Sequence, residues 1–216
     1  MTTVNNKAMV LAAVKQLIGE RNPDAVDTYV HNDYIQHSPQ VKGGKAGLKT
    51  ALQQLRQLPV PEQRESPIVV VMAEDDYVLL LMQLRFMGKR IAIADLYRVA
   101  DGKLAEHWDA TQEEAITLVI PGIAEPGVPA VNKAIVQQFF GSGDIALLAP
   151  GYTGPQDFGG HIIHRIIAEG ALVMVQSTCH GAVFYDIFRL EDQLLAAHWR
   201  VSQVIPAVMP HENGMV

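Results

Sequence analysis

Three side chains of the kinds used in acid/base chemistry lie near one another along the chain: Asp95, His107 and Asp109. Side chains two residues apart on a strand share a face, so His107 and Asp109 point the same way if this stretch is a strand. A short ADGK turn would pair strands predicted at 90–99 and 104–111, which brings Asp95 level with the other two. Two carboxylates and an imidazole at one point suit general acid and base catalysis, because burial and a like charge raise the pKa of one carboxyl.

Each of these residues also has a structural interpretation. Asp95 and Tyr97 belong to a row that is otherwise apolar, where a carboxyl needs a partner or a function. An Asp with an Arg two strands away is often an ion pair, and His107 beside Trp108 could be a hydrogen-bonded core histidine. Taken together the residues favour a site, with Tyr97 as a candidate substrate contact.

Other residues of reactive type give weaker signals. Tyr34 and His37 lie in a predicted loop, HNDYIQHSPQVKGG, where side chains can turn into a cleft, and both are candidate substrate contacts. The spacing of His161 and His164 puts them on opposite faces of a strand, which argues against a metal site. Cys179 has apolar neighbours and is expected to be a buried, inert thiol.

The elements that must position these residues run from helices to strands. Apolar residues at helical spacing predict a first helix ended by Gly19, and Asn22 with Pro23 begins a second helix whose buried side runs to Val30. A third helix follows the predicted loop. Strands are then expected at 68–72, 77–86, 90–99 and 104–111. Helices followed by an antiparallel meander predict an α+β fold.

The chain contains an internal repeat. Residues 95–108, DLYRVADGKLAEHW, align without a gap with residues 186–199, DIFRLEDQLLAAHW. The predicted domains are therefore 1–118, a Pro/Gly linker at 119–130, and a shortened second copy at 131–216. The second copy lacks the third helix and the loop of His37.

The second copy differs from the first where the chemistry is expected. Arg200 stands where the first copy has Asp109, so only the first copy is expected to hold a working site. Apolar residues on both faces of the repeated strands predict that the two copies pack through their sheets as a pseudo-dimer.

Composition excludes several classes of protein. With 17 Lys plus Arg against 23 Asp plus Glu, the formal net charge of −6 provides no basic surface for nucleic acid or an acidic membrane. A single cysteine excludes an intramolecular disulfide and a four-cysteine zinc site. The start of the chain lacks signal-peptide features and no apolar run is long enough to span a membrane, which predicts a cytoplasmic protein.

The segments YIQHSPQVKGGKAGL and DLYRVADGKLAEHWD strongly resemble the SnoaL-like polyketide cyclases of the nuclear transport factor 2-like superfamily. The resemblance implies two tandem cone-shaped α+β barrel units, each with helices followed by a curved antiparallel sheet around an apolar pocket. It also implies acid/base ring closure without metal or cofactor, with Asp109, His107, Asp95 and His37 as candidates by motif position. Whether Asp95 or Asp109 is the base stays open.

We therefore expect a cofactor-independent enzyme of cyclase, lyase or isomerase type. A carboxylate would remove a proton next to a carbonyl of a small apolar molecule, and His107 would stabilise or protonate the enolate. Two alternatives are a small-molecule binding protein that uses the same pocket and a structural dimerisation module. The expected partner is a small molecule, and the protein would be a monomer with an internal pseudo-dimer or a homodimer.

Overall fold

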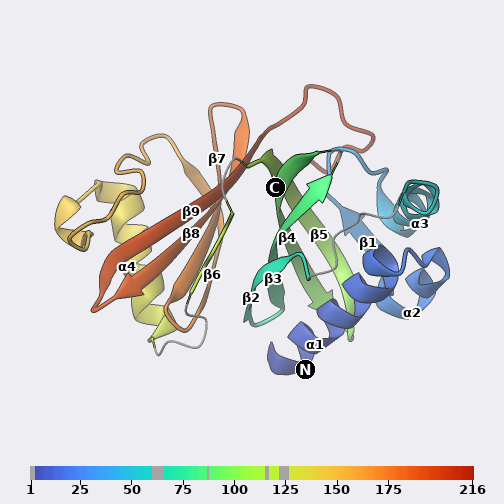
Figure 1. Cartoon of the computed structure of the whole chain (residues 1–216), viewed down its shortest axis with the longest axis horizontal. Coiled ribbons are helices and arrows are strands. Elements are labelled where there is room, and N and C mark those ends of the chain that lie inside the picture. Colours follow the sequence, from blue (N-terminus) through green and yellow to red (C-terminus); the bar gives the residue numbers. More distant parts are fainter. Residues whose placement is uncertain (1–2, 60–65, 87, 115–116, 122–126) are drawn as a thin grey trace.

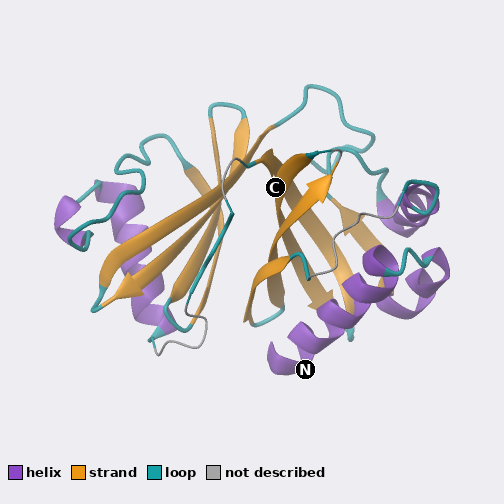
Figure 2. Cartoon of the chain, in the orientation of Figure 1, coloured by secondary structure: helices purple, strands orange, loops and turns teal. Residues whose placement is uncertain are grey.

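The computed structural model describes residues 3–59, 66–86, 88–114, 117–121 and 127–216. Within these residues the chain forms two β-sheets, each accompanied by its own helices (Figure 1). We call residues 3–114 unit one and residues 129–204 unit two. The sheets lie side by side in the middle of the molecule and the helices cover the two outer flanks (Figure 2).

Unit one begins with helices, as the sequence predicts. Asn22 caps the second helical segment, because its side chain accepts a hydrogen bond from the backbone N–H of Asp24 at 3.1 Å. The helical elements are α1 (Thr3–Val14), the π-helical turn η1 (Lys15–Gly19), the 3₁₀ turn η2 (Pro23–Ala25), α2 (Val26–Tyr29) and α3 (Gly44–Leu55).

Five strands of unit one form one sheet in the order β1-β5-β4-β3-β2. The strands are β1 (Val30–Gln36), β2 (Ile68–Glu74), β3 (Tyr77–Phe86), β4 (Lys89–Ala100) and β5 (Lys103–Glu113). Strands β2 to β5 form the predicted antiparallel meander, and the register sets Asp95 opposite Asp109.

The prediction of a loop over HNDYIQHSPQVKGG was wrong in its first half. The helix ends at Tyr29, and Val30–Gln36 form β1, which pairs with β5 in parallel with Gln36 opposite His107. The sheet is therefore antiparallel except along this edge. Buried and exposed side chains alternate in this strand, since Tyr34 and Gln36 are buried while Ile35 is exposed. Residue polarity does not follow this alternation, so the sequence pattern did not indicate a strand.

Unit two repeats the pattern in shorter form. Its elements are α4 (Pro129–Ser142), the 3₁₀ turn η3 (Ile145–Leu147), β6 (Ile162–Glu169), β7 (Leu172–Cys179), β8 (Ala182–Glu191) and β9 (Leu194–Val204). The four strands form an antiparallel sheet in the order β6-β7-β8-β9. The match with unit one extends to the helices, since α4 contains NKAIV where the start of unit one has NKAMV.

The two sheets share one hydrophobic core, which confirms the predicted pseudo-dimer. Leu79, Leu96 and Trp108 of unit one lie in the same buried cluster as Met174 and Tyr185 of unit two. Burying both sheets in one core removes a large apolar area from water, which neither sheet could do alone.

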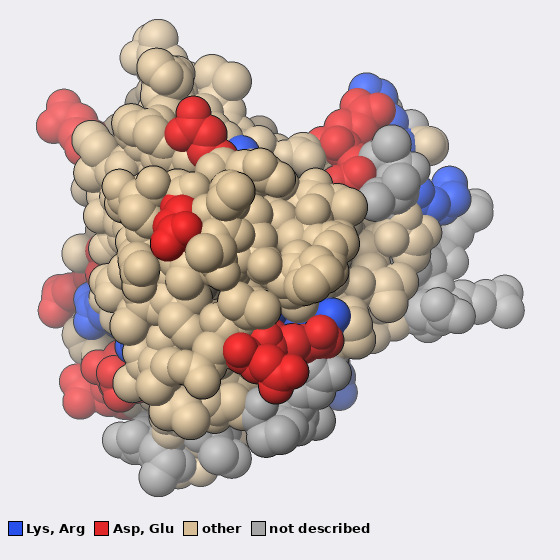
Figure 3. Space-filling view, turned by 90° about the vertical axis from the view of Figure 1, so that its left-hand side faces the viewer, with Lys and Arg blue, Asp and Glu red and all other residues tan. Residues whose placement is uncertain are grey.

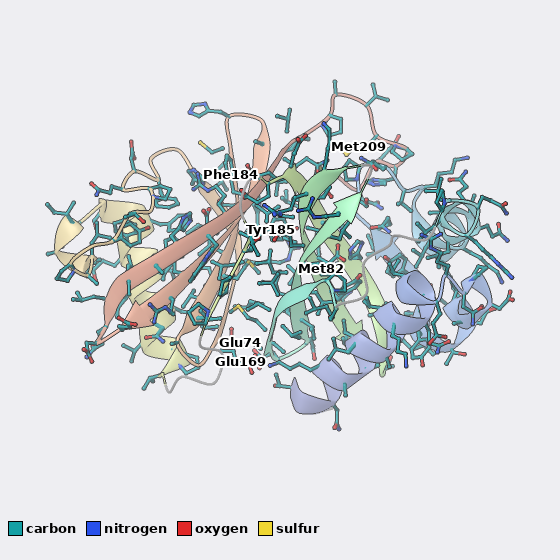
Figure 4. The ribbon with its side chains drawn as sticks, in the orientation of Figure 1. Glu74, Met82, Glu169, Phe184, Tyr185 and Met209 are labelled. Atoms are coloured by element: carbon teal, nitrogen blue, oxygen red, sulfur yellow. The ribbon has the colours of Figure 1, made fainter. Side chains whose placement is uncertain are left out.

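Glu74 of unit one and Glu169 of unit two form equivalent contacts with the opposite unit at one end of this interface (Figure 4). Glu169 accepts a hydrogen bond from the backbone N–H of Ala73 at 2.7 Å, and Glu74 accepts one from Ala168 at 3.0 Å. Each glutamate also forms an ion pair with a lysine in the first helix of the other unit. Glu169 pairs with Lys7 of α1 and Glu74 pairs with Lys133 of α4, both at 2.5 Å. The paired contacts follow the twofold relation expected of a dimer interface.

Strands β5 and β9 meet through a second reciprocal pair. The side-chain oxygen of Gln203 accepts a hydrogen bond from the backbone N–H of Thr111 at 2.8 Å. The side-chain oxygen of Gln112 accepts one from the backbone N–H of Ser202 at 2.9 Å. The two ends of the interface thus use equivalent residues of the repeat.

The predicted domain limits stay a prediction, and residues 122–126 of the predicted linker lie outside the described residues. No helix among the described residues is long and apolar enough to cross a membrane. The outer face of unit two carries separate acidic groups and few basic ones (Figure 3).

Candidate active site

Unit one contains a cavity of about 720 Å³ between its sheet and its helices. Most of the lining is apolar, for example Leu11, Leu48 and Leu52 from the helices. One group of polar lining residues lies on or next to the strands: Tyr34, Gln36, Ser38, Asp95, Tyr97, His107, Asp109 and Thr111. The other polar lining residues are Lys15, Gln40, Gln54 and Ser66. Apolar walls with a few polar groups at one place are typical of small-molecule sites.

The structure brings Asp95, His107 and Asp109 together on the cavity face. One oxygen or nitrogen atom from each of the three lies within 4.8 Å of the others. The β4–β5 hairpin causes this, because its register sets Asp95 beside Asp109 and Tyr97 beside His107. The Tyr97 and His107 rings stack with centroids 4.6 Å apart.

His107 is held at both ring nitrogens. Nδ1 lies 2.9 Å from the Gln36 side-chain oxygen, and Nε2 lies 3.2 Å from Oδ1 of Asp95. The Gln36 oxygen also accepts the backbone N–H of Ser38 at 3.0 Å, so it is an acceptor and Nδ1 of His107 must donate. Burial alone lowers the pKa of His107, but the hydrogen bond and charge of Asp95 outweigh it and raise this pKa.

The two aspartates have different surroundings. Both oxygens of Asp95 have partners, since Oδ1 faces His107 and Oδ2 accepts from the Tyr97 hydroxyl at 3.4 Å. In Asp109, Oδ2 accepts from the Ser38 hydroxyl at 3.0 Å, whereas Oδ1 is buried and has no hydrogen-bond partner among the described residues. Burial, with the nearby charge of Asp95, raises the pKa of Asp109 against the opposing charge of His107.

The two tyrosines of the cavity are neutral donors. Burial and the nearby carboxylates raise the pKa of Tyr34 and of Tyr97 well above the ordinary value. The Tyr34 hydroxyl accepts from the Gln36 amide at 3.2 Å, and this hydrogen bond does not use the hydroxyl's own proton. Both tyrosines, predicted as substrate contacts, line the cavity.

Sequence reasoning missed Gln36 and Ser38. Gln36 is the last residue of β1 and contacts His107, and Ser38, two residues further on, contacts Asp109. The alternation Tyr34, Gln36, Ser38 would have revealed a common face, had the segment been taken as a strand. Its polar composition favoured a loop instead.

His37 does not line the cavity of unit one, because it points to the opposite face of the chain from Gln36. Its ring stacks on Trp108 with centroids 4.9 Å apart. Nε2 lies 2.9 Å from Glu106, and Nδ1 lies 3.0 Å from the backbone oxygen of Gly214. The residue thus belongs to the interface between the units, and the prediction that it contacts substrate in the cavity is wrong.

The equivalent position in unit two is neutralised and filled. Asp186 is fully buried, with His198 at 2.7 Å and Arg200, which replaces Asp109, at 2.6 Å from the same oxygen. The space between sheet and helix is packed by the aromatic side chains of Phe139, Phe140, Phe158 and Phe188. Oδ2 of Asp186, like Oδ1 of Asp109, is buried without a hydrogen-bond partner among the described residues. The two units differ in that Arg200 and His198 pair with Asp186 in a packed core, whereas Asp109 lines a cavity.

The other sequence candidates take structural places in unit two. His161 and His164 bond to different neighbours, Ser177 at 2.9 Å and Thr178 at 2.8 Å, in keeping with opposite faces. Cys179 is buried. Among the described residues, the donor set that could hold a metal ion is the same Asp95, His107 and Asp109, since carboxylate and imidazole are ligands for divalent ions.

Comparison with known proteins identifies one family. The family model for SnoaL-like polyketide cyclases matches residues 8–117. No curated protein matches the chain.

Several solved structures are similar to about half of the chain. TsrD from Streptomyces laurentii is 18% identical, covering 52% of this chain and 91% of its own, with a TM-score of 0.43. An NTF2-like protein from Burkholderia xenovorans is 16% identical, with coverages of 52% and 92% and a TM-score of 0.43. An NTF2-like protein from Mesorhizobium loti is 11% identical, with coverages of 52% and 95% and a TM-score of 0.44.

Proposed function

Because the chain belongs to the SnoaL-like polyketide cyclase family, we propose that unit one catalyses cofactor-independent acid/base chemistry on a small apolar carbonyl compound. The observation that carries the proposal is the buried, unpartnered Oδ1 of Asp109, in a residue that lines a mostly apolar cavity. A buried carboxylate with a free oxygen and a raised pKa is suited to remove a weakly acidic proton.

In this mechanism Asp109 is the base and Asp95 orients His107. Oδ1 of Asp109 takes a proton from the carbon next to a carbonyl, and the electron pair of that C–H bond moves onto the carbonyl oxygen as an enolate. The Tyr34 hydroxyl donates a hydrogen bond to that oxygen, and the positive charge of His107 stabilises it. Asp95 is the poorer base, because its oxygens are already bonded to His107 and Tyr97.

The enolate then has two outcomes that need no further reagent. Its carbon can attack a second carbonyl of the same molecule, which forms a ring C–C bond and leaves an alkoxide that takes the proton from Asp109. Where the substrate has a C=C bond next to the deprotonated carbon, the enolate is a dienolate, and Asp109 can return the proton to the far carbon of that bond, which is an isomerisation. Apolar walls favour both, since they exclude water from the enolate.

One observation favours the alternative of a non-catalytic binding protein. Both ring nitrogens of His107 and both oxygens of Asp95 are used by protein groups, as in a network that only stabilises the sheet. Such a protein would bind the same apolar ligand and leave it unchanged. A purely structural module receives no support, because the cavity of unit one is open to a ligand of considerable size.

The test is hydrogen exchange at carbon, which detects enolate formation without knowledge of the natural substrate. Proton NMR would follow deuterium incorporation from D₂O into 2-tetralone and 1-phenyl-1,3-butanedione. We expect Asp109→Asn to slow this exchange by about 100-fold or more. Glu113→Gln is the matched control, because Glu113 lies on the same strand and is exposed.

The same variant separates catalysis from architecture. A raised pKa means that the folded protein holds the proton of Asp109 more tightly than the unfolded chain. The protonated Asp109 carboxyl therefore contributes stability at pH values below its ordinary pKa of 3.8. This contribution is lost as the pH rises through the raised pKa of the folded protein. At neutral pH, Asp109→Asn should leave the urea unfolding midpoint unchanged or higher.

Three results would contradict the proposal. Wild-type exchange no faster than buffer, together with binding of 2-naphthol in the cavity, would favour the binding protein. Unchanged exchange in Asp109→Asn with a lowered unfolding midpoint would make Asp109 architectural. Loss of exchange after EDTA treatment and its return with Zn²⁺ would show that the three donors hold a metal.

A further inference from the structure

The last twelve residues of the chain cross from unit two back to unit one. After β9 the segment 205–216, which we call the C-terminal tail, runs over the top of the molecule and ends above the sheet of unit one (Figure 1). Ile205, Met209 and Val216 pack against the shared core and Met215 is buried within it. Met209 lies on the side of unit one (Figure 4). The tail is therefore anchored on both sides of the segment described next.

Residues 211–214 of the tail bond to three consecutive residues of unit one. The Asn213 side chain donates to the backbone oxygen of Gln36 at 2.9 Å. His211 Nε2 lies 2.8 Å from the backbone oxygen of Ser38. Between them, the Gly214 oxygen lies 3.0 Å from Nδ1 of His37.

The direction of the His211 contact follows from its other nitrogen. Nδ1 of His211 accepts the backbone N–H of Asn213 at 3.3 Å, so the proton of the neutral ring is on Nε2. The ring therefore donates to the Ser38 oxygen. Both contacts from the tail leave the side chains of Gln36 and Ser38 free to bond elsewhere.

The opposite ends of these residues contact the acid/base groups. The Gln36 side chain accepts from His107 at 2.9 Å, and the Ser38 hydroxyl donates to Asp109 at 3.0 Å. Each path from tail to site passes through a single residue. A shift of the backbone at Gln36 or Ser38 would move the partner of His107 or Asp109 by the same amount.

We propose that the C-terminal tail is a positioning element for the site of unit one, in which Asn213 and His211 hold Gln36 and Ser38 in the places from which they orient His107 and Asp109. The inference rests on the proposed function, because orienting His107 and Asp109 affects turnover only if these residues are catalytic. Its structural part can be tested without turnover. It assigns the second copy a role in the site of the first, beyond covering the sheet.

The test uses the full chain with His211→Ala and Asn213→Ala combined. The matched control is Val208→Ala with Glu212→Ala, because both of these tail residues are exposed. The first measurement is NMR of ¹⁵N-labelled histidine rings, with His107 assigned by a His107→Gln spectrum. We expect the His107 Nδ1–H signal to shift and to exchange with water about 10- to 100-fold faster in the double variant. The control should match wild type.

The second measurement is α-proton exchange of 2-tetralone. The double variant should lower kcat by about 10- to 100-fold with KM nearly unchanged, because the cavity walls are intact and only orientation is lost. His211→Gln should keep most of the rate that His211→Ala loses, since the Gln amide keeps a hydrogen-bond donor near the Ser38 backbone oxygen.

Each outcome decides the matter. His107 signals identical in wild type, control and double variant would overturn the positioning role. Altered signals with no exchange of 2-tetralone even by wild type would support positioning and count against the proposed function. If the double variant does not fold, the single variants His211→Ala and Asn213→Ala carry the same comparison.

Discussion

At the scale of single residues, one replacement separates the two units. Asp109 and Arg200 occupy the same position of the repeat, next to an Asp and a His that both copies keep. Arg200 places its guanidinium over the rings of Phe158 and Phe184 and pairs with Asp186. The positive side chain of Arg200 thus stabilises a closed core. Ionisation of Asp109, in contrast, places a negative charge in a buried position, which lowers the stability of the fold.

Ser38 should set the pH range of activity. Its hydrogen bond lowers the pKa of Asp109, against burial and Asp95, which raise it, while His107 and His211 lower it. Ser38→Ala should therefore raise that pKa. The base works only when ionised, so activity is present above the pKa of Asp109 and lost as pH falls through it. We expect the acid limb of the kcat/KM profile for 2-tetralone exchange to move to higher pH.

The control for this change is Ser66→Ala. Ser66 lines the same cavity, but its hydroxyl accepts from the backbone N–H of Ile68. Its removal should leave the acid limb in place. A limb that stays fixed in Ser38→Ala would mean that Asp109 is not the group whose ionisation limits the reaction.

At the scale of elements, the ends of β2 and β6 are joined by the reciprocal glutamates. Ala73 and Ala168 are buried, so each backbone N–H depends on the glutamate of the other unit. Either Glu74→Ala or Glu169→Ala should lower the free energy of unfolding by about 1–3 kcal/mol, the cost of an unsatisfied buried donor. Urea unfolding would measure both.

Glu113→Ala is the comparison for these variants. Glu113 also pairs with a lysine, Lys89, but both side chains are about 60% exposed. Its removal should change the free energy of unfolding by roughly 0.5 kcal/mol or less. Equal, small losses in all three variants would show that the interface does not depend on the reciprocal contacts.

At the scale of the whole molecule, the shared core predicts that the units unfold together. The chain has two tryptophans, Trp108 in unit one and Trp199 in unit two, and both touch the same cluster. In the single-tryptophan variants Trp199→Phe and Trp108→Phe, the fluorescence reports one unit each. Each fluorescence midpoint in urea should coincide with the far-UV circular dichroism midpoint of the same variant.

Separate transitions would contradict this prediction. If Trp108 fluorescence changed at one urea concentration and the circular dichroism in two steps, the units would be independent domains. The comparison is made within each variant, because replacing a buried tryptophan lowers stability by itself.

The sequence alone determined the features that depend on neighbours along the chain. The repeat follows from comparing the chain with itself, and the meander from Ile68 to Glu113 follows from apolar runs separated by short turns. The convergence of Asp95, His107 and Asp109 follows from alternation and the ADGK turn. The cap at Asn22 is likewise local. The strand pairs of the meander join neighbouring strands, and even the widest pair, Ile91 with Glu113, is close in sequence compared with the pairing of β1 with β5. Turn geometry and side-chain parity leave few alternatives over such short stretches.

Tertiary structure decided what depends on distant segments. The parallel pairing of β1 with β5 places Gln36 and Ser38 at the site from 71 residues away, and Asn213 reaches Gln36 across 177 residues. Tyr34 lines the cavity while His37 faces Trp108, because a strand rather than a loop set their directions. Such pairings are chosen by the free energy of burying both sheets in one core, which is a property of the packed molecule, and the local alternation of Tyr34, Gln36 and Ser38 does not say which distant strand they meet.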